Sequence, residues 1–302
     1  MVGIKKNVYF CSVLFNRYTN TGSFLSYKII MINVNNINFK YAGQKRLVFD
    51  NFSLTLEENQ IYGLLGKNGT GKSTLLYLLS GLLRPTAGSV TCDGVATYKR
   101  QAEMLSRIFL VTEEFELPAI HLSEYVKLYK PFYPQFSEEI LKGCLADFDL
   151  PEDVHLGKLS MGQRKKAYIA FAMATNTQYL LMDEPTNGLD IPSKSQFRKV
   201  IAQHMTDDRT VIISTHQVHD VEQLLDHVLI LDQRNVLLNA SMQEIMDQYT
   251  FEYRTPQQMD ADVLYAEPTL QGNAVVANRK EGDAETQVNL ELLFNYKTQA
   301  KI

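Results

Sequence analysis

The hydrophobic pattern of the chain switches between strand-like and helix-like periods, which predicts the order of its elements. Alternating apolar positions predict two strands within residues 31–56. Further strands are predicted at residues 61–65, 88–96, 108–112, 178–184 and 210–215, with two more within 227–238. Helices are predicted at residues 73–79, 98–107, 122–130, 137–148, 161–175, 192–205 and 218–225. Strands that alternate with helices favour a parallel sheet, where functional groups gather at the carboxyl ends of strands.

Two stretches depart from this alternation. Residues 115–175 are mostly helical and are punctuated by prolines, which predicts a helical block inserted into an α/β core. From about residue 250 the pattern changes, with one strand predicted at 251–265, another at 274–278, and either a strand or a helix at 287–296. This tail carries no catalytic pattern, and we expect a small accessory element or regulatory flap.

Composition narrows the class of protein. The chain has 302 residues with 45% hydrophobic and 21% charged positions, which fits one large α/β domain with appendages. The formal net charge of −4 gives no electrostatic reason to expect nucleic acid as the main partner. Cys11, Cys92 and Cys144 are scattered without metal-ligand spacing, which suits a reduced cytosolic protein. No apolar run is long enough to predict a membrane-spanning helix.

Residues 1–30 are expected to be a poorly ordered extension outside the fold. A short apolar run at residues 8–15 follows two lysines and faintly resembles a signal peptide. A polar pair ends this run, and no small-residue cleavage site follows it cleanly, so we predict no signal peptide. Met31 would be a natural start of the folded chain.

The strongest chemical pattern is GKNGTGKS at residues 66–73, which fits the phosphate-binding pattern G-x-x-x-x-G-K-[ST]. A predicted strand before it and a predicted helix after it provide the context that this pattern needs. Glycines let backbone N–H groups surround phosphate oxygens, and the helix N-terminus adds unpaired N–H groups and a positive dipole end. Lys72 can reach the β- and γ-phosphates, and the Ser73 hydroxyl can bind Mg²⁺.

Two carboxylates, Asp183 and Glu184, end the predicted strand at residues 178–184. Mg²⁺-dependent nucleotide hydrolysis needs such a pair, because one carboxylate holds the metal and the other polarises the attacking water. Acids also end strands for structural reasons, but the phosphate-binding pattern upstream favours the chemical explanation. Four residues follow predicted parallel strands and are expected at one edge of the sheet: Lys72, Glu113, Glu184 and His216.

Two further features have both a structural and a functional explanation. LSMGQ at residues 159–163 precedes three basic residues; Ser160 suits a helix N-cap and Gly162 permits close backbone approach. A capped amphipathic helix with its basic residues on a solvated face would explain the same pattern. Tyr41 is either a half-exposed strand aromatic or a platform on which a nucleotide base stacks.

In this order, the motifs resemble those of the ATP-binding cassette (ABC) ATPases of membrane transporters, over about residues 31–245. The matching stretches are residues 66–73 (Walker A), 159–163 (the LSGGQ signature, with Met161 for its first glycine), 180–186 (Walker B), 187–190 (D-loop) and 214–216 (switch histidine). The resemblance implies a P-loop NTPase of ABC type. Its parts would be a mainly parallel α/β sheet, an antiparallel β subdomain, a helical subdomain at about 115–175 and a small C-terminal accessory segment at 246–302.

The resemblance also implies a role for each matched residue. Glu184 would be the general base, His216 would hold the γ-phosphate and orient the water, and Lys72 would bind the phosphates. Mg²⁺ would bind at Ser73, Asp183 and Glu113. Within one subunit, ATP would contact Tyr41, Gly66, Asn68, Gly69, Thr70, Gly71, Lys72, Ser73 and Thr74. In a head-to-tail dimer, the second subunit would add Ser160, Gly162 and Gln163, and Asp190 would couple the two sites.

Glu113 departs from the family pattern, which usually has glutamine at this position. That glutamine touches Mg²⁺ and the attacking water, and its loop senses the transmembrane partner. A carboxylate at Glu113 can still ligate the metal. Its negative charge near the γ-phosphate would slow turnover.

The resemblance implies a subunit that powers transport from the cytoplasmic face of the cell membrane. Its partners would be a transmembrane permease subunit and a second ABC ATPase subunit, with a homodimer expected. The single compact cassette and short tail most resemble the ATPases of exporters of small molecules, peptides or lipid-linked compounds. The alternative is a soluble ABC ATPase that acts as an assembly scaffold without a membrane partner. The transported substrate is set by the permease.

Overall fold

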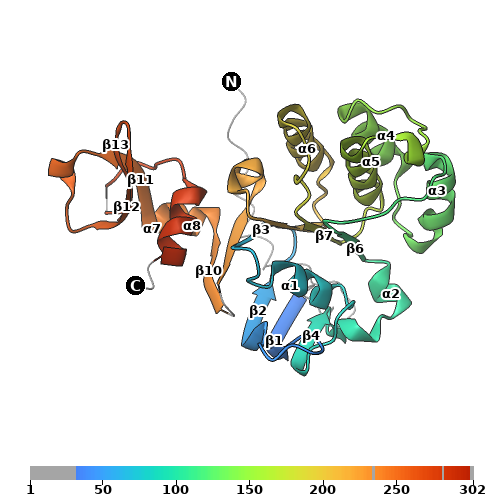
Figure 1. Cartoon of the computed structure of the whole chain (residues 1–302), viewed down its shortest axis with the longest axis horizontal. Coiled ribbons are helices and arrows are strands. Elements are labelled where there is room, and N and C mark those ends of the chain that lie inside the picture. The colour runs from blue at the N-terminus through green and yellow to red at the C-terminus, as the bar shows by residue number, and fades with distance from the viewer. Residues whose placement is uncertain (1–31, 233–234, 281, 300–302) are drawn as a thin grey trace, which may run out of the picture.

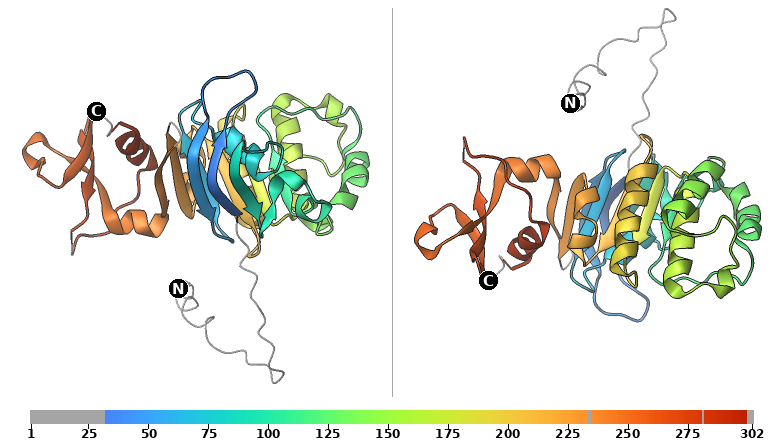
Figure 2. Two further views of the ribbon diagram at one scale, coloured as in Figure 1. Left: turned by 90° about the horizontal axis from the view of Figure 1, so that it is seen from below. Right: turned by 90° about the horizontal axis from the view of Figure 1, so that it is seen from above.

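The computed structural model describes residues 32–232, 235–280 and 282–299 (Figure 1). Residues 1–30, predicted to be an extension, lie outside the described residues. The described chain forms three sheets with a block of helices at one end and a small C-terminal unit at the other (Figure 2). Within the described residues, no helix combines the length and apolar character needed to cross a membrane.

The central sheet has six strands in the order β10-β9-β3-β8-β7-β6. Five of them run parallel, and β10 pairs with β9 antiparallel. The strands are β3 (Ile61–Gly66), β6 (Ile108–Val111), β7 (Tyr179–Asp183), β8 (Thr210–Thr215), β9 (His227–Asp232) and β10 (Asn235–Ser241). The predicted parallel sheet is therefore confirmed, and its carboxyl ends share one edge.

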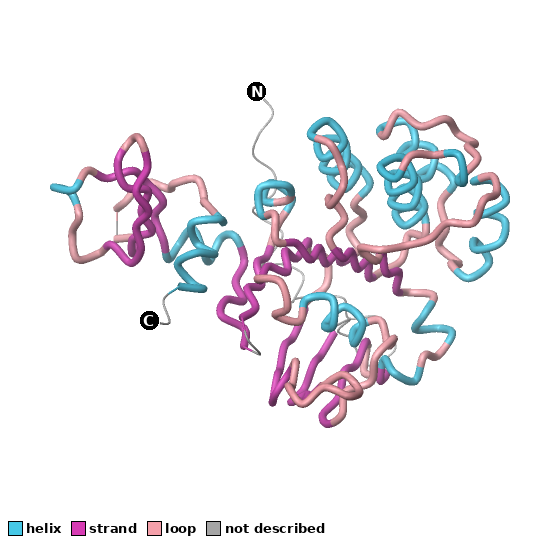
Figure 3. Tube along the Cα trace, in the orientation of Figure 1, coloured by secondary structure: helices cyan, strands magenta, loops and turns pink. Residues whose placement is uncertain are grey.

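Alternate side chains of the central strands face two different cores. On β3, Ile61 and Leu65 join the core beneath α5 (Met161–Ala174) and α6 (Ile191–His204). Tyr62 and Leu64 face the opposite way, toward α1 (Lys72–Leu79) and the antiparallel sheet. Figure 3 shows the central strands nearly edge-on between these layers. Covering on both faces explains why these strands are almost continuously apolar.

The antiparallel sheet has the order β2-β1-β4-β5. Its strands are β1 (Ile32–Phe39), β2 (Phe49–Leu56), β4 (Ala87–Cys92) and β5 (Val95–Ala96). The slip in the alternation of β1 corresponds to register shifts against β2 on either side of Ile37. Asn36 has a left-handed φ of 46° there, so the strand stays continuous while its pairing shifts.

The helical block contains α3 (Leu122–Tyr129), α4 (Glu138–Asp147) and the start of α5, as predicted. Two other predicted helices are wrong. The stretch at 98–107 is broken at Arg100, whose left-handed φ of 48° separates a 3₁₀ turn from the short α2 (Ala102–Leu105). The stretch at 218–225 contains two 3₁₀ turns, because Val221 between them has a non-helical φ of −129°.

The C-terminal unit follows α7 (Met242–Gln248) and contains a three-stranded sheet in the order β11-β13-β12. The strands are β11 (Tyr249–Arg254), β12 (Val263–Thr269) and β13 (Gly272–Asn278). The single strand predicted over 251–265 is thus two strands, separated by a 3₁₀ turn at Pro256–Gln258. The ambiguous stretch at 287–296 corresponds to a helix, α8 (Leu290–Gln299), which buries Leu290, Leu292 and Leu293.

Candidate active site

A cleft of about 500 Å³ opens at the carboxyl edge of the central sheet. Ten of the residues that the sequence predicts for the site line it: Tyr41, Asn68, Gly69, Gly71, Lys72, Ser73, Thr74, Glu113, Glu184 and His216. Gln44, Val48 and Asn187 line it as well. The expected meeting of Lys72, Glu113, Glu184 and His216 at one edge is therefore seen in the structure.

The glycine-rich loop joins β3 to α1 and forms one wall of the cleft. Gly69 and Gly71 have positive φ angles of 79° and 105°, which side-chain-bearing residues rarely adopt. Gly66 lies deeper, where a Cβ atom would come within 2.5 Å of the Thr70 hydroxyl oxygen. That hydroxyl donates to the Lys67 carbonyl at 2.9 Å. Gly66 and Thr70 thus shape the loop rather than line the cleft.

Lys72 and Glu184 lie close together and are almost fully buried, with 7% and 5% of their surface exposed. The Lys72 ammonium donates to the Gly66 carbonyl at 2.8 Å and lies 3.7 Å from Glu184 Oε1. His216 Nδ1 lies 2.9 Å from the same carboxylate oxygen. The backbone N–H of His216 donates to the other oxygen at 3.4 Å. Glu184 is therefore held between a cation and an imidazole.

The backbone at the end of β7 separates the two predicted carboxylates. Asp183 is the last strand residue, is 1% exposed, and accepts a short hydrogen bond from the Ser214 hydroxyl. Glu184 then adopts a left-handed φ of 45°, and its N–H donates to the Ser214 carbonyl at 2.9 Å. The reversal turns Glu184 into the cleft while Asp183 stays beneath it. Such a backbone angle is strained for a glutamate, and such strain clusters at functional sites.

Asn187 is a cleft residue that the sequence reasoning missed. Its side-chain N–H donates to Glu113 Oε1 at 2.8 Å, and its amide oxygen accepts from Gln217 at 3.2 Å. It thus connects the loops that follow β6, β7 and β8. Its position in the D-loop-like stretch was the signal that pointed to it.

Lys165 does not fit the alternative explanation in which the basic residues after LSMGQ lie on a solvated helix face. It is 4% exposed, and its ammonium donates to the carbonyls of Glu184 at 2.9 Å and Asn187 at 2.8 Å. Burial lowers the pKa of Lys165, while Glu113, Glu184 and Asp183 oppose that shift. Arg164 and Lys166 are partly exposed. A solvated helix face is therefore compatible with Arg164 and Lys166 but not with Lys165.

Ser160, Gly162, Gln163 and Asp190 do not line the cleft. Ser160 caps α5, accepting from the Gln163 N–H at 3.3 Å, while the Gln163 side chain accepts from the Ser160 N–H at 3.1 Å. Met161 beside them is 65% exposed. Asp190 caps α6 by accepting from the Ser193 N–H at 3.0 Å. Hydrogen bonding by the Ser193 side chain, and next by this N–H, lowers the pKa of the Asp190 carboxyl.

Tyr41 reaches the cleft from the loop after β1. Its hydroxyl lies 3.0 Å from that of Thr74, and its ring meets Phe39 edge-on at 5.1 Å between centroids. These contacts fix the ring beside the N-terminal turn of α1. A base that stacks on Tyr41 would thus lie next to the phosphate-binding loop.

The three predicted metal-binding residues are hard oxygen donors, which suit Mg²⁺. Within the described residues, no group of three or more His, Cys, Asp or Glu side chains could hold a metal alone. That fits Mg²⁺, which usually binds through one or two protein groups together with water and substrate phosphates. Ser73 and Glu113 line the cleft and Asp183 lies beneath it, so the donor set is compatible with Mg²⁺ bound to a nucleotide.

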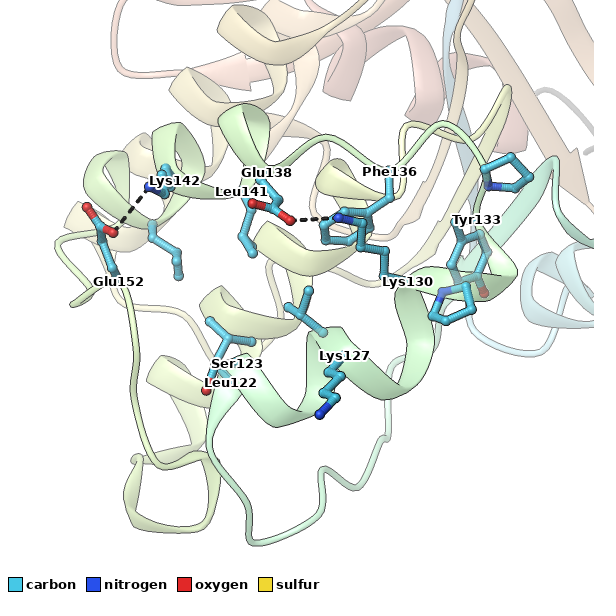
Figure 4. Close-up of a pocket in the computed structure, with 14 residues that line it drawn as sticks. Leu122, Ser123, Lys127, Lys130, Tyr133, Phe136, Glu138, Leu141, Lys142 and Glu152 are labelled. Carbon is cyan, nitrogen blue, oxygen red and sulfur yellow. Dashed lines mark hydrogen bonds and ion pairs between the residues drawn. The ribbon is translucent and has the colours of Figure 1, made fainter.

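A larger hollow of about 760 Å³ lies within the helical block, between α3 and α4. Figure 4 shows two of its lysines paired across the rim, Lys130 with Glu138 and Lys142 with Glu152. Its walls are mostly apolar, and none of the predicted site residues lines it. The hollow is therefore separate from the candidate active site.

Comparison with known proteins identifies the family. Residues 49–187 match the family model described as ABC transporter. The chain is 30% identical over 227 residues to the ABC transporter ATP-binding protein NatA of Bacillus subtilis (strain 168), covering 72% of this chain and 92% of that protein. The chain belongs to the ABC transporter ATP-binding proteins. It is therefore an ATPase that serves as the ATP-binding subunit of a transporter.

Two further similarities extend this assignment. The methionine import ATP-binding protein MetN of Carboxydothermus hydrogenoformans (strain ATCC BAA-161 / DSM 6008 / Z-2901) is 30% identical over 221 residues, covering 68% of this chain and 65% of that protein. A solved structure of the ATP-binding subunit of an ABC transporter superposes with a TM-score of 0.63 at 22% identity, covering 71% and 91% of the two chains. The predicted fold class is thereby confirmed. The transporter names also favour transport over the assembly-scaffold alternative.

Proposed function

We propose that this ABC ATPase works as a head-to-tail homodimer, hydrolyses ATP with Mg²⁺, and drives a transmembrane permease from the cytoplasmic face of the membrane. The proposal rests on the fact that the predicted site residues lie in two separate places. Lys72, Glu184 and His216 meet in one cleft, while Ser160 and Gln163 lie outside it at the exposed start of a helix. A second copy of the chain can bring the start of its own α5 to this cleft.

The cleft supplies the groups that bind and orient ATP. Tyr41 stacks on the adenine, and backbone N–H groups of the loop residues that line the cleft surround the phosphates. The Lys72 ammonium, which lies beside Glu184 in the structure, binds the γ-phosphate when ATP is present. Ser73, Asp183 and Glu113 would hold Mg²⁺, which would supply positive charge to neutralise the phosphates.

Glu184 and His216 act on the attacking water. Glu184 accepts the proton of the water as it attacks the γ-phosphate, and burial of the carboxylate keeps competing solvent away. His216, 2.9 Å from Glu184, orients that carboxylate and holds a γ-phosphate oxygen. The start of α5 from the other subunit closes the cleft. Its helix N-terminus and backbone N–H groups suit an anionic phosphate, and three residues there reach the ATP: Ser160, Gly162 and Gln163. Asp190 of the other subunit couples the two sites.

A surface groove of about 830 Å³ suits a cytoplasmic helix of the permease. The groove lies between α2, β6 and residues 131–134. Leu82 and Phe132 on its wall are 54% and 66% exposed. Large apolar side chains gathered on a surface mark interaction sites. Family membership, which implies a transmembrane component, supports the permease as the occupant.

The proposed direction of transport is export of small molecules, peptides or lipid-linked compounds. The support is the resemblance of residues 31–245 to the cassettes of exporter ATPases. MetN is named for import, so the identity of the permease decides between the two directions.

Affinity purification of the tagged chain from detergent-solubilised membranes tests the permease partner and should recover a stoichiometric polytopic protein. Phe132→Asp should lose that partner while keeping ATP hydrolysis, and recovery of a soluble dimer alone would contradict the docking proposal.

The catalytic assignment is tested with Glu184→Gln. Removing the base should lower kcat for ATP hydrolysis by about 100-fold or more, since general base catalysis contributes about 10² to 10⁴. The dissociation constant for ATP should change less than about threefold, and ATP should convert the variant into stable dimers visible by light scattering. Glu139→Gln, an exposed carboxylate on α4, is the matched control. Normal turnover by Glu184→Gln would overturn the assignment of the base.

A further inference from the structure

Lys165 is a buried cation that the mechanism above does not use. It lies on α5, and its ammonium contacts backbone carbonyls of the turn after β7, at Glu184 and Asn187. Within the described residues, no carboxylate oxygen forms an ion pair with it. A buried lysine without a paired carboxylate is costly to retain, so its bonds to this turn need an explanation.

The turn that Lys165 holds carries two groups of the cleft. Glu184 occupies a left-handed backbone conformation, which only surrounding bonds can maintain in a glutamate. Asn187, three residues later, closes the turn by donating its N–H to the Glu184 carbonyl at 3.2 Å. The Asn187 side chain then fixes Glu113. The two Lys165 bonds therefore pin both ends of the turn, with Glu184 at one end and Asn187 at the other.

The positive charge of Lys165 supports the same role as its hydrogen bonds. The titratable groups that face Lys165 are Glu113 after β6, and Asp183 and Glu184 at the end of β7. These three carboxylates surround a cleft that, in the proposed function, receives the negative phosphates of ATP. Lys165 supplies a positive charge from beneath the cleft, without occupying the space where the phosphates bind.

The neighbouring cations of α5 have other partners. Arg164 Nε donates to the Leu159 carbonyl at 3.0 Å, at the start of the same helix. The Lys166 ammonium donates to Gln196 Oε1 on α6 at 2.7 Å. Of these three basic residues, only Lys165 donates hydrogen bonds to the turn. The same helix also begins at Ser160, the residue proposed to reach the ATP of the other subunit.

We propose that Lys165 is a positioning residue for ATP hydrolysis, which holds the Glu184–Asn187 turn so that Glu184 points at the attacking water and Glu113 stays at the cleft. The inference rests on the proposed role of Glu184 as the base. It assigns Lys165 no contact with ATP. Its loss should therefore affect the chemical step much more than nucleotide binding.

Lys165→Met and Lys165→Gln separate the two contributions of the side chain. Methionine removes both the charge and the hydrogen bonds, so kcat should fall on the order of 100-fold, as expected when a catalytic group is misplaced by about 1 Å. Glutamine keeps an N–H donor but no charge, and kcat should fall on the order of tenfold. KM for ATP should change less than about threefold in both. The matched control is Lys166→Met, which removes a cation from the same helix and should stay within about twofold of wild type.

Measurements on the full-length dimer distinguish positioning from simple loss of structure. A structural defect would lower the melting temperature and ATP binding together with kcat, whereas positioning predicts a selective loss of kcat. Should Lys165→Met fail to fold, Lys165→Gln carries the test. Adding Glu113→Gln to Lys165→Gln removes a negative charge and should recover part of the lost kcat. Wild-type kcat in Lys165→Gln and Lys165→Met, or equal loss of kcat and ATP affinity, would overturn the inference.

The outcome for Glu184→Gln keeps the two proposals distinguishable. If Glu184→Gln abolishes turnover but the Lys165 variants turn over normally, the base stands and the positioning role fails. If Glu184→Gln turns over normally, the base assignment fails whatever the Lys165 variants do.

Discussion

The nucleotide cleft and the start of α5 differ in how completely their polar groups are partnered. In the cleft, Lys72 and Glu184 are buried and bonded to groups of the same chain. At the start of α5, Ser160 and Gln163 are exposed, and their side-chain hydrogen bonds in the described residues join only each other. The cleft is thus preorganised by its own chain, whereas the helix start presents outward the groups that we propose bind phosphate. A site shared between two copies accounts for both conditions.

The largest expected effect comes from blocking the exposed half without touching the cleft. Ser160→Arg places a bulky side chain at the N-cap of α5, so the second subunit can no longer close over ATP. The turnover number should fall on the order of 100-fold, since closure excludes water and completes the site. Binding of ATP to the monomer, measured with a fluorescent analogue, should stay within about threefold. A matching loss of monomer binding would contradict the division into two halves.

A smaller effect is expected on the cleft side from Tyr41→Ala. Base stacking on an aromatic ring is worth about 1 to 3 kcal/mol, and the partly buried ring here suggests the lower part of that range. The dissociation constant for ATP should rise about five- to thirtyfold, by isothermal titration calorimetry. Tyr41→Phe is the control for the hydroxyl, which lies 3.0 Å from that of Thr74. If phenylalanine weakens binding as much as alanine, the hydroxyl rather than stacking is responsible.

The smallest expected effect is on stability, and it comes from an ion pair that joins the helical block to the core. Asp147 on α4 accepts from Lys199 at 2.8 Å and lies 3.2 Å from His204 Nε2, both on α6. These contacts, with the Lys199 bond the largest cause, hold the pKa of Asp147 below its usual value. The Asp147 carboxylate therefore stabilises the fold above the ordinary carboxyl pKa of about 4. This stabilisation is lost as the pH falls through the lower pKa that Asp147 has in the folded protein.

Asp147→Asn should lower the free energy of unfolding at pH 7 by about 1 kcal/mol or less, as is usual for partly exposed ion pairs. The difference from wild type should shrink as pH falls below about 4, and chemical denaturation across this range measures it. A difference that is equally large at pH 3 and pH 7 would show that the carboxylate charge is not its source.

The sequence was most informative where a residue follows a buried strand. Lys72, Glu113, Glu184 and His216 could be placed together because short apolar runs fix the strands, and parallel strands end at one edge. Lys165 could not be placed in this way. Helical periodicity assigns it a face of α5, but its burial depends on a turn about twenty positions later in the chain, at Glu184 and Asn187.

The failures of secondary-structure prediction have local backbone causes. Arg100 and Val221 each interrupt a helix-like pattern by adopting a non-helical φ, which apolar periodicity does not encode. In the C-terminal unit, β12 is only partly buried along its length, so its alternation is weak and it merged with β11 in the prediction. Such half-covered strands depend on tertiary contacts.

The most direct test of the shared site is a mixing experiment with two impaired variants. Lys72→Ala lacks the lysine proposed to bind phosphate and Ser160→Arg blocks the exposed half, so each homodimer should retain only a small fraction of wild-type ATPase activity. A mixed dimer combines the intact cleft of one subunit with the intact α5 start of the other and thus has one complete site. The account predicts that ATPase activity rises when the two purified variants are mixed. Activity no higher than the sum of the separate variants would contradict a site built from two copies of the chain.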